Sequence, residues 1–116
     1  MRLKEEILNT INILKSLSDL NRLRILKLLT YCESTCNCYI EESLELNQSN
    51  ASRHLSKLKN SNLIIAIKSG KWTYYSLNKN VLEKNKFILD ILLNLSDDIF
   101  LKDKMKFLSI KKNNCN

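Results

Sequence analysis

Four cysteines are the residues of this sequence best suited to bind an ion or to change oxidation state. Cys36 and Cys38 are two residues apart, Cys32 precedes this pair by four residues, and Cys115 is the next-to-last residue. Thiolates are soft ligands and select soft or borderline ions. The residues beside Cys38 are an asparagine and a tyrosine, so no imidazole or carboxylate cluster adjoins the pair. The sequence therefore indicates a metal-binding or redox site whose reactive atoms are cysteine sulfurs.

The spacing of Cys36 and Cys38 predicts how such a site is coupled to the fold. The pair lies at the expected start of a short helix, where the helix dipole lowers the pKa of a thiol. Residues two apart on an α-helix point about 200° apart, so both sulfurs cannot face one ion in a regular helix. Binding is therefore expected to unwind or distort the start of this helix.

Residues 46–61, LNQSNASRHLSKLKNS, form a second distinctive stretch. Asn47 is a good helix N-cap, and a narrow apolar stripe recurs behind it at helical spacing. The other face is short, polar and cationic, as in helices whose first turns enter the major groove of DNA; the alternative is a solvated surface helix. The candidate DNA contacts are Gln48, Ser49, Asn50, Ser52, Arg53 and Lys57, together with Lys68 and Lys71 on a later basic hairpin tip.

These candidates divide by the part of DNA that they suit. The amides of Gln48 and Asn50 can bond adenine, and Arg53 can reach guanine or phosphate. The hairpin lysines suit phosphates, which position a protein without specifying sequence. The single histidine, His54, lies at the edge of the apolar stripe, so a hydrogen-bonded packing role or a contact to the DNA backbone is expected rather than metal ligation.

Composition limits the class of protein. The chain has 116 residues, enough for one domain, and a net charge of +7, which favours a polyanionic partner such as nucleic acid. No apolar run is long enough to span a membrane and no signal peptide is present. We therefore expect a cytosolic protein in which thiols stay reduced.

The periodicity predicts a mainly α-helical chain with a β-hairpin wing, a winged helix-turn-helix formed as a single domain over residues 1–116. Four helices are expected in this part of the chain. The first covers about 2–16, and the second runs from a cap at Ser18 or Asp19 to about 31. The third and fourth cover 36–44 and 48–61. Strands at 63–68 and 71–77 are joined by Ser69–Gly70, and their aromatic residues Trp72, Tyr74 and Tyr75 are expected to pack rather than to stack on bases. One helix capped by Asn78 reaches 95, a last helix covers 99–110, and residues 111–116 form a polar tail.

Several segments together resemble the arsenic-sensing branch of the ArsR/SmtB family of metal-responsive repressors: LSDLNRLRILKLL, Cys36-Asn37-Cys38, LNQSNASRHLSKLKNSNLI and GKWTYYSL. Leu20, Ser49 and Asn62 depart from residues frequent in the family, but each suits its local position. The resemblance implies a cytoplasmic homodimer, joined through its first and last long helices, that represses transcription by binding an inverted-repeat operator. It further implies that the dimer releases DNA when metal binds.

The resemblance also guides the choice of ligands. Cys36 and Cys38 match the Cys-x-Cys of the family, whereas Glu41 stands where the arsenic branch often has a further cysteine. Three thiolates with one open side fit trivalent arsenic or antimony, As(III) or Sb(III), which keeps a lone pair. Cys32 is the preferred third ligand and Cys115 is its competitor; the alternative for Cys32 is a plain core residue. No catalytic residue and no organic cofactor are expected.

Other functions compete with arsenic sensing. A thiol redox sensor of the same fold would form a Cys32–Cys36 disulfide, and a Cd-, Pb- or Zn-responsive relative would use another site. The region 80–95 has no histidine for zinc, and no cysteine precedes Cys32 for an N-terminal cadmium or lead site. A thiol oxidoreductase or metal carrier would leave the basic helix unused. A winged helix used only for protein contacts would show no salt-sensitive DNA binding.

Overall fold

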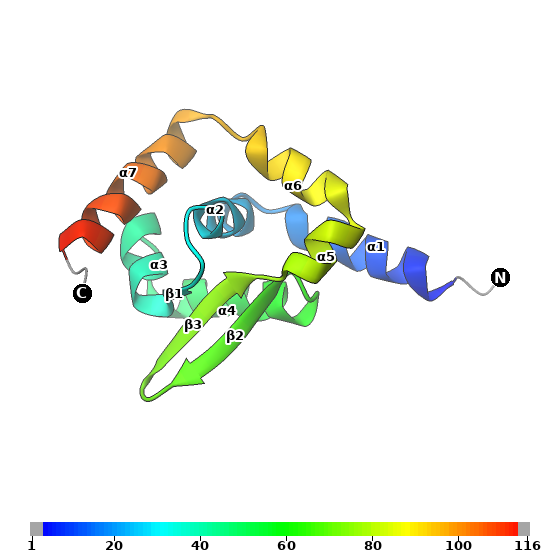
Figure 1. The fold of residues 1–116 in the computed structure, drawn as a ribbon, viewed down its shortest axis with the longest axis horizontal. Coiled ribbons are helices and arrows are strands. Elements are labelled where there is room, and N and C mark those ends of the chain that lie inside the picture. The colour runs from blue at the N-terminus through cyan, green and yellow to red at the C-terminus, as the bar shows by residue number, and fades with distance from the viewer. Residues whose placement is uncertain (1–3, 114–116) are drawn as a thin grey trace.

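Helices enclose the apolar core of this protein, and a β-hairpin projects from them (Figure 1). The computed structural model describes residues 4–113. Its elements are α1 (Glu5–Leu17), α2 (Leu20–Leu29), β1 (Thr35–Cys36), α3 (Asn37–Leu44), α4 (Gln48–Asn60), β2 (Ile64–Ser69), β3 (Trp72–Leu77), α5 (Lys79–Lys84), α6 (Lys86–Leu93) and α7 (Asp98–Asn113). The predicted winged helix-turn-helix is confirmed: α3 and α4 form the helix-turn-helix, and β2 with β3 forms the wing.

Capping residues begin and end the helices where the sequence predicts. Asp19, Asn47 and Asn78 each accept a hydrogen bond from the backbone N–H three residues later, at 3.0, 2.8 and 3.4 Å respectively. Each side chain satisfies one of the N–H groups that have no partner inside the helix. Asn62 follows α4 with a φ of 63°, the left-handed conformation expected of it.

The sheet contains one strand that the sequence analysis did not predict. Strands β2 and β3 pair antiparallel, with Ser69 opposite Trp72, so the turn residues are Gly70 and Lys71 rather than Ser69 and Gly70. Gly70 has a φ of 61°, which glycine adopts without strain. The two-residue β1 pairs with the other edge of β3, and it is too short to show an alternating pattern.

The C-terminal half differs from the predicted helices at two points. The single helix expected between residues 78 and 95 is broken at Asn85, whose side-chain amide donates to the Val81 carbonyl at 3.0 Å and whose φ is −129°. Such local bonding lets asparagine compete with the helix. The last helix, α7, reaches Asn113 rather than Ile110, and the rest of the predicted tail lies outside the described residues.

Helix α2 lies at the centre of the core, as its wide apolar surface predicts. Ile25, Leu26, Leu28 and Leu29 are at most 1% exposed. They pack with buried residues of α3, α4, α6 and α7. Within residues 4–113, no helix has both the length and the apolar character that a membrane span requires.

A buried ion pair attaches α7 to this centre. The Arg24 guanidinium donates through Nε and Nη2 to the two carboxylate oxygens of Asp103, both at 2.8 Å. Nη2 also donates to the Leu44 carbonyl at 2.9 Å. The two side chains are only 11% and 5% exposed, so one guanidinium links α2, α3 and α7.

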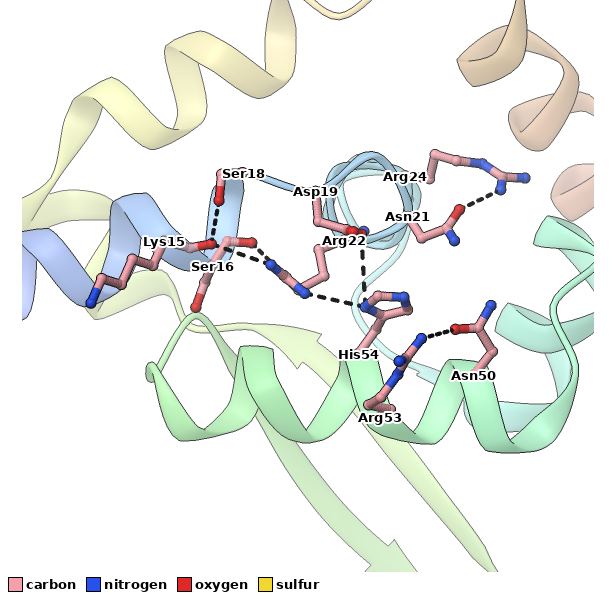
Figure 2. A network of polar contacts seen from close by, with 10 residues as sticks. All are labelled: Lys15, Ser16, Ser18, Asp19, Asn21, Arg22, Arg24, Asn50, Arg53 and His54. Carbon is pink, nitrogen blue, oxygen red and sulfur yellow. Dashed lines mark hydrogen bonds and ion pairs between the residues drawn. The ribbon is translucent and has the colours of Figure 1, made fainter.

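A second arginine of α2 anchors α4 (Figure 2). Arg22 donates to the carbonyls of Ser16 and Lys15 at 2.7 and 3.2 Å, and its Nη1 lies 3.3 Å from Nδ1 of the buried His54. The same Nδ1 lies 3.7 Å from the Asp19 carboxylate, so it accepts from Arg22 when the ring is neutral and pairs with Asp19 when the ring is protonated. Burial and the charges of Arg22 and Arg53 lower the pKa of His54, against the opposing effect of Asp19. The expected packing role of His54 is confirmed.

Replacing Asp103 by alanine should destabilise the protein by about 3–5 kcal/mol, because Arg24 would remain buried without its counterion. Urea denaturation at neutral pH measures this loss. Glu45→Gln is the control, since exposed Glu45 pairs with Lys102 and Lys106 of the same α7. Its denaturation midpoint should stay unchanged. Equal losses in both variants would contradict the assignment of the α7 anchor to the buried pair.

Stability should fall as pH falls from 7.5 to 5.5. The pKa of His54 is lower in the folded than in the unfolded chain, so the unfolded chain binds more protons in this window. His54 is the only histidine, so His54→Gln should flatten the dependence. Urea denaturation at several pH values measures both slopes; an unchanged slope in the variant would refute the assignment.

Candidate thiol site and nucleic-acid interface

Cys36 and Cys38 lie together at the start of α3, joined by a disulfide with their Cα atoms 5.3 Å apart. Two expectations are therefore wrong for this structure. The pair is oxidised rather than reduced, and its sulfurs meet without unwinding a helix. The physical reason is that Cys36 is the N-cap, with extended φ and ψ of −77° and 159°, so the 200° separation inside a helix does not apply.

The backbone around Cys36 connects the pair to two other elements. Its Sγ accepts a hydrogen bond from the Tyr39 N–H at 3.4 Å, which caps α3. In β1 the same residue pairs with Tyr74 of β3, the strand that forms half of the wing. Helix α3 also packs against α4 and α7. A change at the sulfur of Cys36 therefore acts on both the helix-turn-helix and the wing.

A pocket of about 280 Å³ opens beside the two sulfurs. Trp72 and Tyr74 line it from β3 and are 40% and 38% exposed, so they lie outside the core. Of the expected core and cross-strand packing, Tyr74 keeps the cross-strand part, opposite Ile67. Tyr75, on the other face of β3, does pack against the core. The full lining consists of Ser34, Thr35, Cys36, Cys38, Tyr39, Trp72, Tyr74, Phe107 and Lys111.

The third predicted ligand is not gathered with the pair. Cys32 is a half-buried free thiol that packs against the core after α2. Burial raises its pKa, Lys111 opposes this effect and Glu33 adds to it. Among the described residues, no three His, Cys, Asp or Glu side chains lie close enough to hold a metal ion. The competing Cys115 lies outside the described residues.

The outer face of α4 presents its polar residues to solvent. Ala51, His54, Leu55 and Leu58 are buried, which confirms the apolar stripe. Arg53 donates to the side-chain oxygen of Asn50 at 2.7 Å, and this bond holds the guanidinium over the first turns of the helix. The candidate contacts Gln48, Ser49, Ser52, Arg53 and Lys57 are exposed, and Asn50 is half-buried.

The wing brings two further cations to the surface. Lys68 and Lys71 are exposed near the hairpin tip, which projects away from the helices (Figure 1). The Lys71 ammonium lies 5.4 Å from the centre of the Trp72 ring, a cation–π contact that holds it beside the tip. The structure thus places a cationic helix face and a cationic hairpin in one chain, as an interface with the grooves and phosphates of DNA requires.

The sequence does not predict the aromatic pocket as a unit. Side chains alternate along a strand, so the sequence predicts that Trp72 and Tyr74 lie on the same face of β3. Nothing in the sequence pairs that face with Cys36, because β1 has only two residues. Phe107 and Lys111 come from α7, whose position depends on the Arg24–Asp103 ion pair.

Comparisons with known proteins agree with this arrangement. The family model described as "Bacterial regulatory protein, arsR family" matches residues 19–66. An arsenical resistance operon repressor of Bacillus subtilis is 42% identical over 64 residues, covering 55% of this chain and 61% of that protein. The chain thus spans less than two thirds of that relative. A repressor of the same description from Staphylococcus xylosus is 39% identical over 85 residues, covering 73% and 80%.

A solved structure supports the fold. The homodimeric winged helix-turn-helix DNA-binding domain Mb0332 of Mycobacterium bovis, a possible ArsR-family regulator, matches 83% of this chain and 94% of its own, with a TM-score of 0.66 and 20% identity. At that identity the likeness concerns the fold alone. The family assignment comes from the sequence matches. The chain belongs to the arsR family of bacterial regulatory proteins.

Proposed function

We propose that this protein is a transcriptional repressor that binds operator DNA as a homodimer and releases it when trivalent arsenic or antimony binds the reduced thiolates of Cys36 and Cys38. The observation that carries this proposal is the position of Cys36. It caps α3, which packs against α4, and it pairs with β3 of the wing. The names of the arsenical resistance relatives support the choice of ligand.

Exposed apolar side chains support the homodimer. Helix α1 presents Ile7, Leu8, Ile11 and Leu14 to solvent, and α6 presents Leu89, Ile91 and Leu93. Apolar side chains that recur on an exposed helix support an interaction site there. A two-fold dimer through α1 and α6 would place two α4 helices about one DNA turn apart, which suits an inverted-repeat operator.

The coupling between thiols and DNA follows from the groups that Cys36 serves. An arsenic–sulfur bond would fix the position of the Cys36 sulfur, which accepts from the Tyr39 N–H and caps α3. A shift of Cys36 also moves β1 against β3. Both changes alter how α4 and the wing are held, so the bound form fits DNA less well. By linkage, DNA must weaken arsenic binding by the same factor.

The third position on the ion requires a further ligand in this proposal. Cys32 is the candidate that the sequence favours, and it must move toward the pair. Cys115 is the alternative candidate. A relative that responds to Cd, Pb or Zn instead would be recognised by a response to those ions and none to arsenite.

A thiol redox sensor is the second candidate function. The specific observation that favours it is the Cys36–Cys38 disulfide. Oxidation would join the same two sulfurs that arsenic would bridge, so it would act on the same cap and the same strand pair. The redox alternative predicts a disulfide between Cys32 and Cys36. In the structure the partner of Cys36 is Cys38 instead.

Arg53→Ala should weaken binding to a duplex selected from a random library by about 1–3 kcal/mol and relax its sequence preference. Lys68→Ala and Lys71→Ala should instead weaken all duplexes alike and reduce the salt slope by about 1 each. Fluorescence anisotropy at several salt concentrations measures both effects. Lys102→Ala, an exposed lysine of α7, is the control. If this control loses as much affinity for DNA as the wing variants, the assignment of the wing lysines to the DNA interface is refuted.

Arsenite should release the selected duplex from reduced wild-type protein but not from Cys36→Ser or Cys38→Ser, since both sulfurs hold the ion. Titration of the protein–DNA complex with arsenite, zinc, cadmium, lead and a mild oxidant measures this response. Cys32→Ser and Cys115→Ser identify the third ligand: the variant that weakens the arsenite response has lost it. Release by the oxidant alone would leave redox sensing as the function.

A further inference from the structure

A second pocket lies between the last turns of α1 and α4, and it shares no lining residue with the pocket beside the thiols. Its volume is about 310 Å³. Three residues of α1 and three from the end of α4 line it: Asn12, Lys15, Ser16, Lys57, Asn60 and Ser61. We propose that this α1–α4 pocket binds a backbone phosphate of the operator. The inference rests on the proposed function, because it adds a contact to the same protein–DNA complex.

The two helices contribute the same kinds of side chain to the α1–α4 pocket at the same spacing. Asn12, Lys15 and Ser16 stand at positions i, i+3 and i+4 of α1, so they share one face, and the three residues from α4 repeat this spacing. The buried Ser16 hydroxyl donates to the Ser61 hydroxyl at 2.8 Å. This bond holds together the two helices that line the pocket. Figure 2 shows Lys15 and Ser16 at the end of α4 that lies away from Asn50.

The charge of the α1–α4 pocket suits an anion. No carboxylate lines it, and neither Lys15 nor Lys57 forms an ion pair with an acidic residue within residues 4–113. Two ammonium groups at one pocket repel each other, and an anion between them removes this repulsion. The side-chain amides of Asn12 and Asn60 make no hydrogen bond within the same part of the chain, so their N–H groups are free to donate to a phosphate oxygen.

The position of the α1–α4 pocket favours a phosphate of DNA as its ligand. Four polar residues follow one side of α4 at helical spacing: Asn50, Arg53, Lys57 and Asn60. From the first to the last of them the helix rises by about 15 Å, somewhat more than the major-groove width of about 12 Å. A helix whose first turns reach base edges therefore has its last turn beside the backbone that bounds the groove. A phosphodiester at that point would lie between Lys57 and Lys15.

The test measures binding of the selected duplex and of unrelated duplexes by the full-length protein carrying Lys15→Gln. Lys15 is exposed and glutamine is a good helix former, so the substitution removes charge and spares the fold. It should weaken binding of every duplex about fivefold at about 0.15 M salt and reduce the salt slope by about 1, because one phosphate contact is lost. Lys15→Arg should restore both values. Lys4→Gln is the matched control and should bind like wild type, since Lys4 is exposed at the other end of α1 and does not line the pocket.

Neutral methylphosphonates, placed at one phosphate of the selected duplex at a time, locate the contact. One position in each half-site should weaken binding by wild type about fivefold and leave binding by Lys15→Gln unchanged, because both changes remove the same contact. The inference is overturned if no position shows this coupling, or if Lys4→Gln loses as much affinity as Lys15→Gln.

Inorganic phosphate is the second probe, because a free anion has the same chemistry as a backbone phosphate. If it shifts the ammonium NMR signals of Lys15 and Lys57 while no methylphosphonate position couples to Lys15, the pocket is a site for free anions and the inference is overturned. The proposed function would stand in either case if Arg53→Ala still weakened DNA binding. If wild type bound no duplex at all, both proposals would fall.

Discussion

The backbone at Cys36 satisfies three demands at once, and the proposed response depends on all of them. The residue is extended, so it can pair with β3; it precedes α3, so its sulfur can cap the helix; and it directs that sulfur toward Cys38. A residue inside the helix could meet none of these demands. Because one atom serves both as a cap and as a bonding partner, chemistry at sulfur is directly a change in local structure.

Helix α2 holds the elements that carry the thiol pair and the candidate DNA contacts. Its two arginines point to different partners: Arg24 holds α3 and α7, and Arg22 holds α1 and lies against His54 of α4. Partly buried arginines with several fixed acceptors specify geometry more strictly than apolar contacts, since each N–H has a direction. In the proposed response, a movement of α3 would be resisted on the α2 side and would act on α4 and the wing.

The thiol pair and the candidate DNA surface are separated in the chain but share elements. Strand β3 contributes Trp72 and Tyr74 to the pocket, and at its start Lys71 lies against Trp72 near the tip of the wing. Helix α3 contains Cys38 and is capped by Cys36, and it leads, through the left-handed Glu45, into α4. Because these elements are shared, the candidate thiol site and the candidate nucleic-acid interface lie close together in a small domain.

The sequence by itself determined the local features: the caps at Asp19, Asn47 and Asn78, the left-handed Asn62, the buried α2, the hairpin and the cationic face of α4. These depend on the side-chain chemistry and periodicity of neighbouring residues, which the sequence displays directly. Only the tertiary structure decided that Cys36 lies outside the helix, that Trp72 and Tyr74 face a pocket, and that Asn85 breaks a helix. The first two depend on the pairing of a two-residue strand with β3 and on an ion pair that positions α7, both between residues far apart in sequence. The third depends on a side-chain bond competing with the helix, whose outcome periodicity cannot predict.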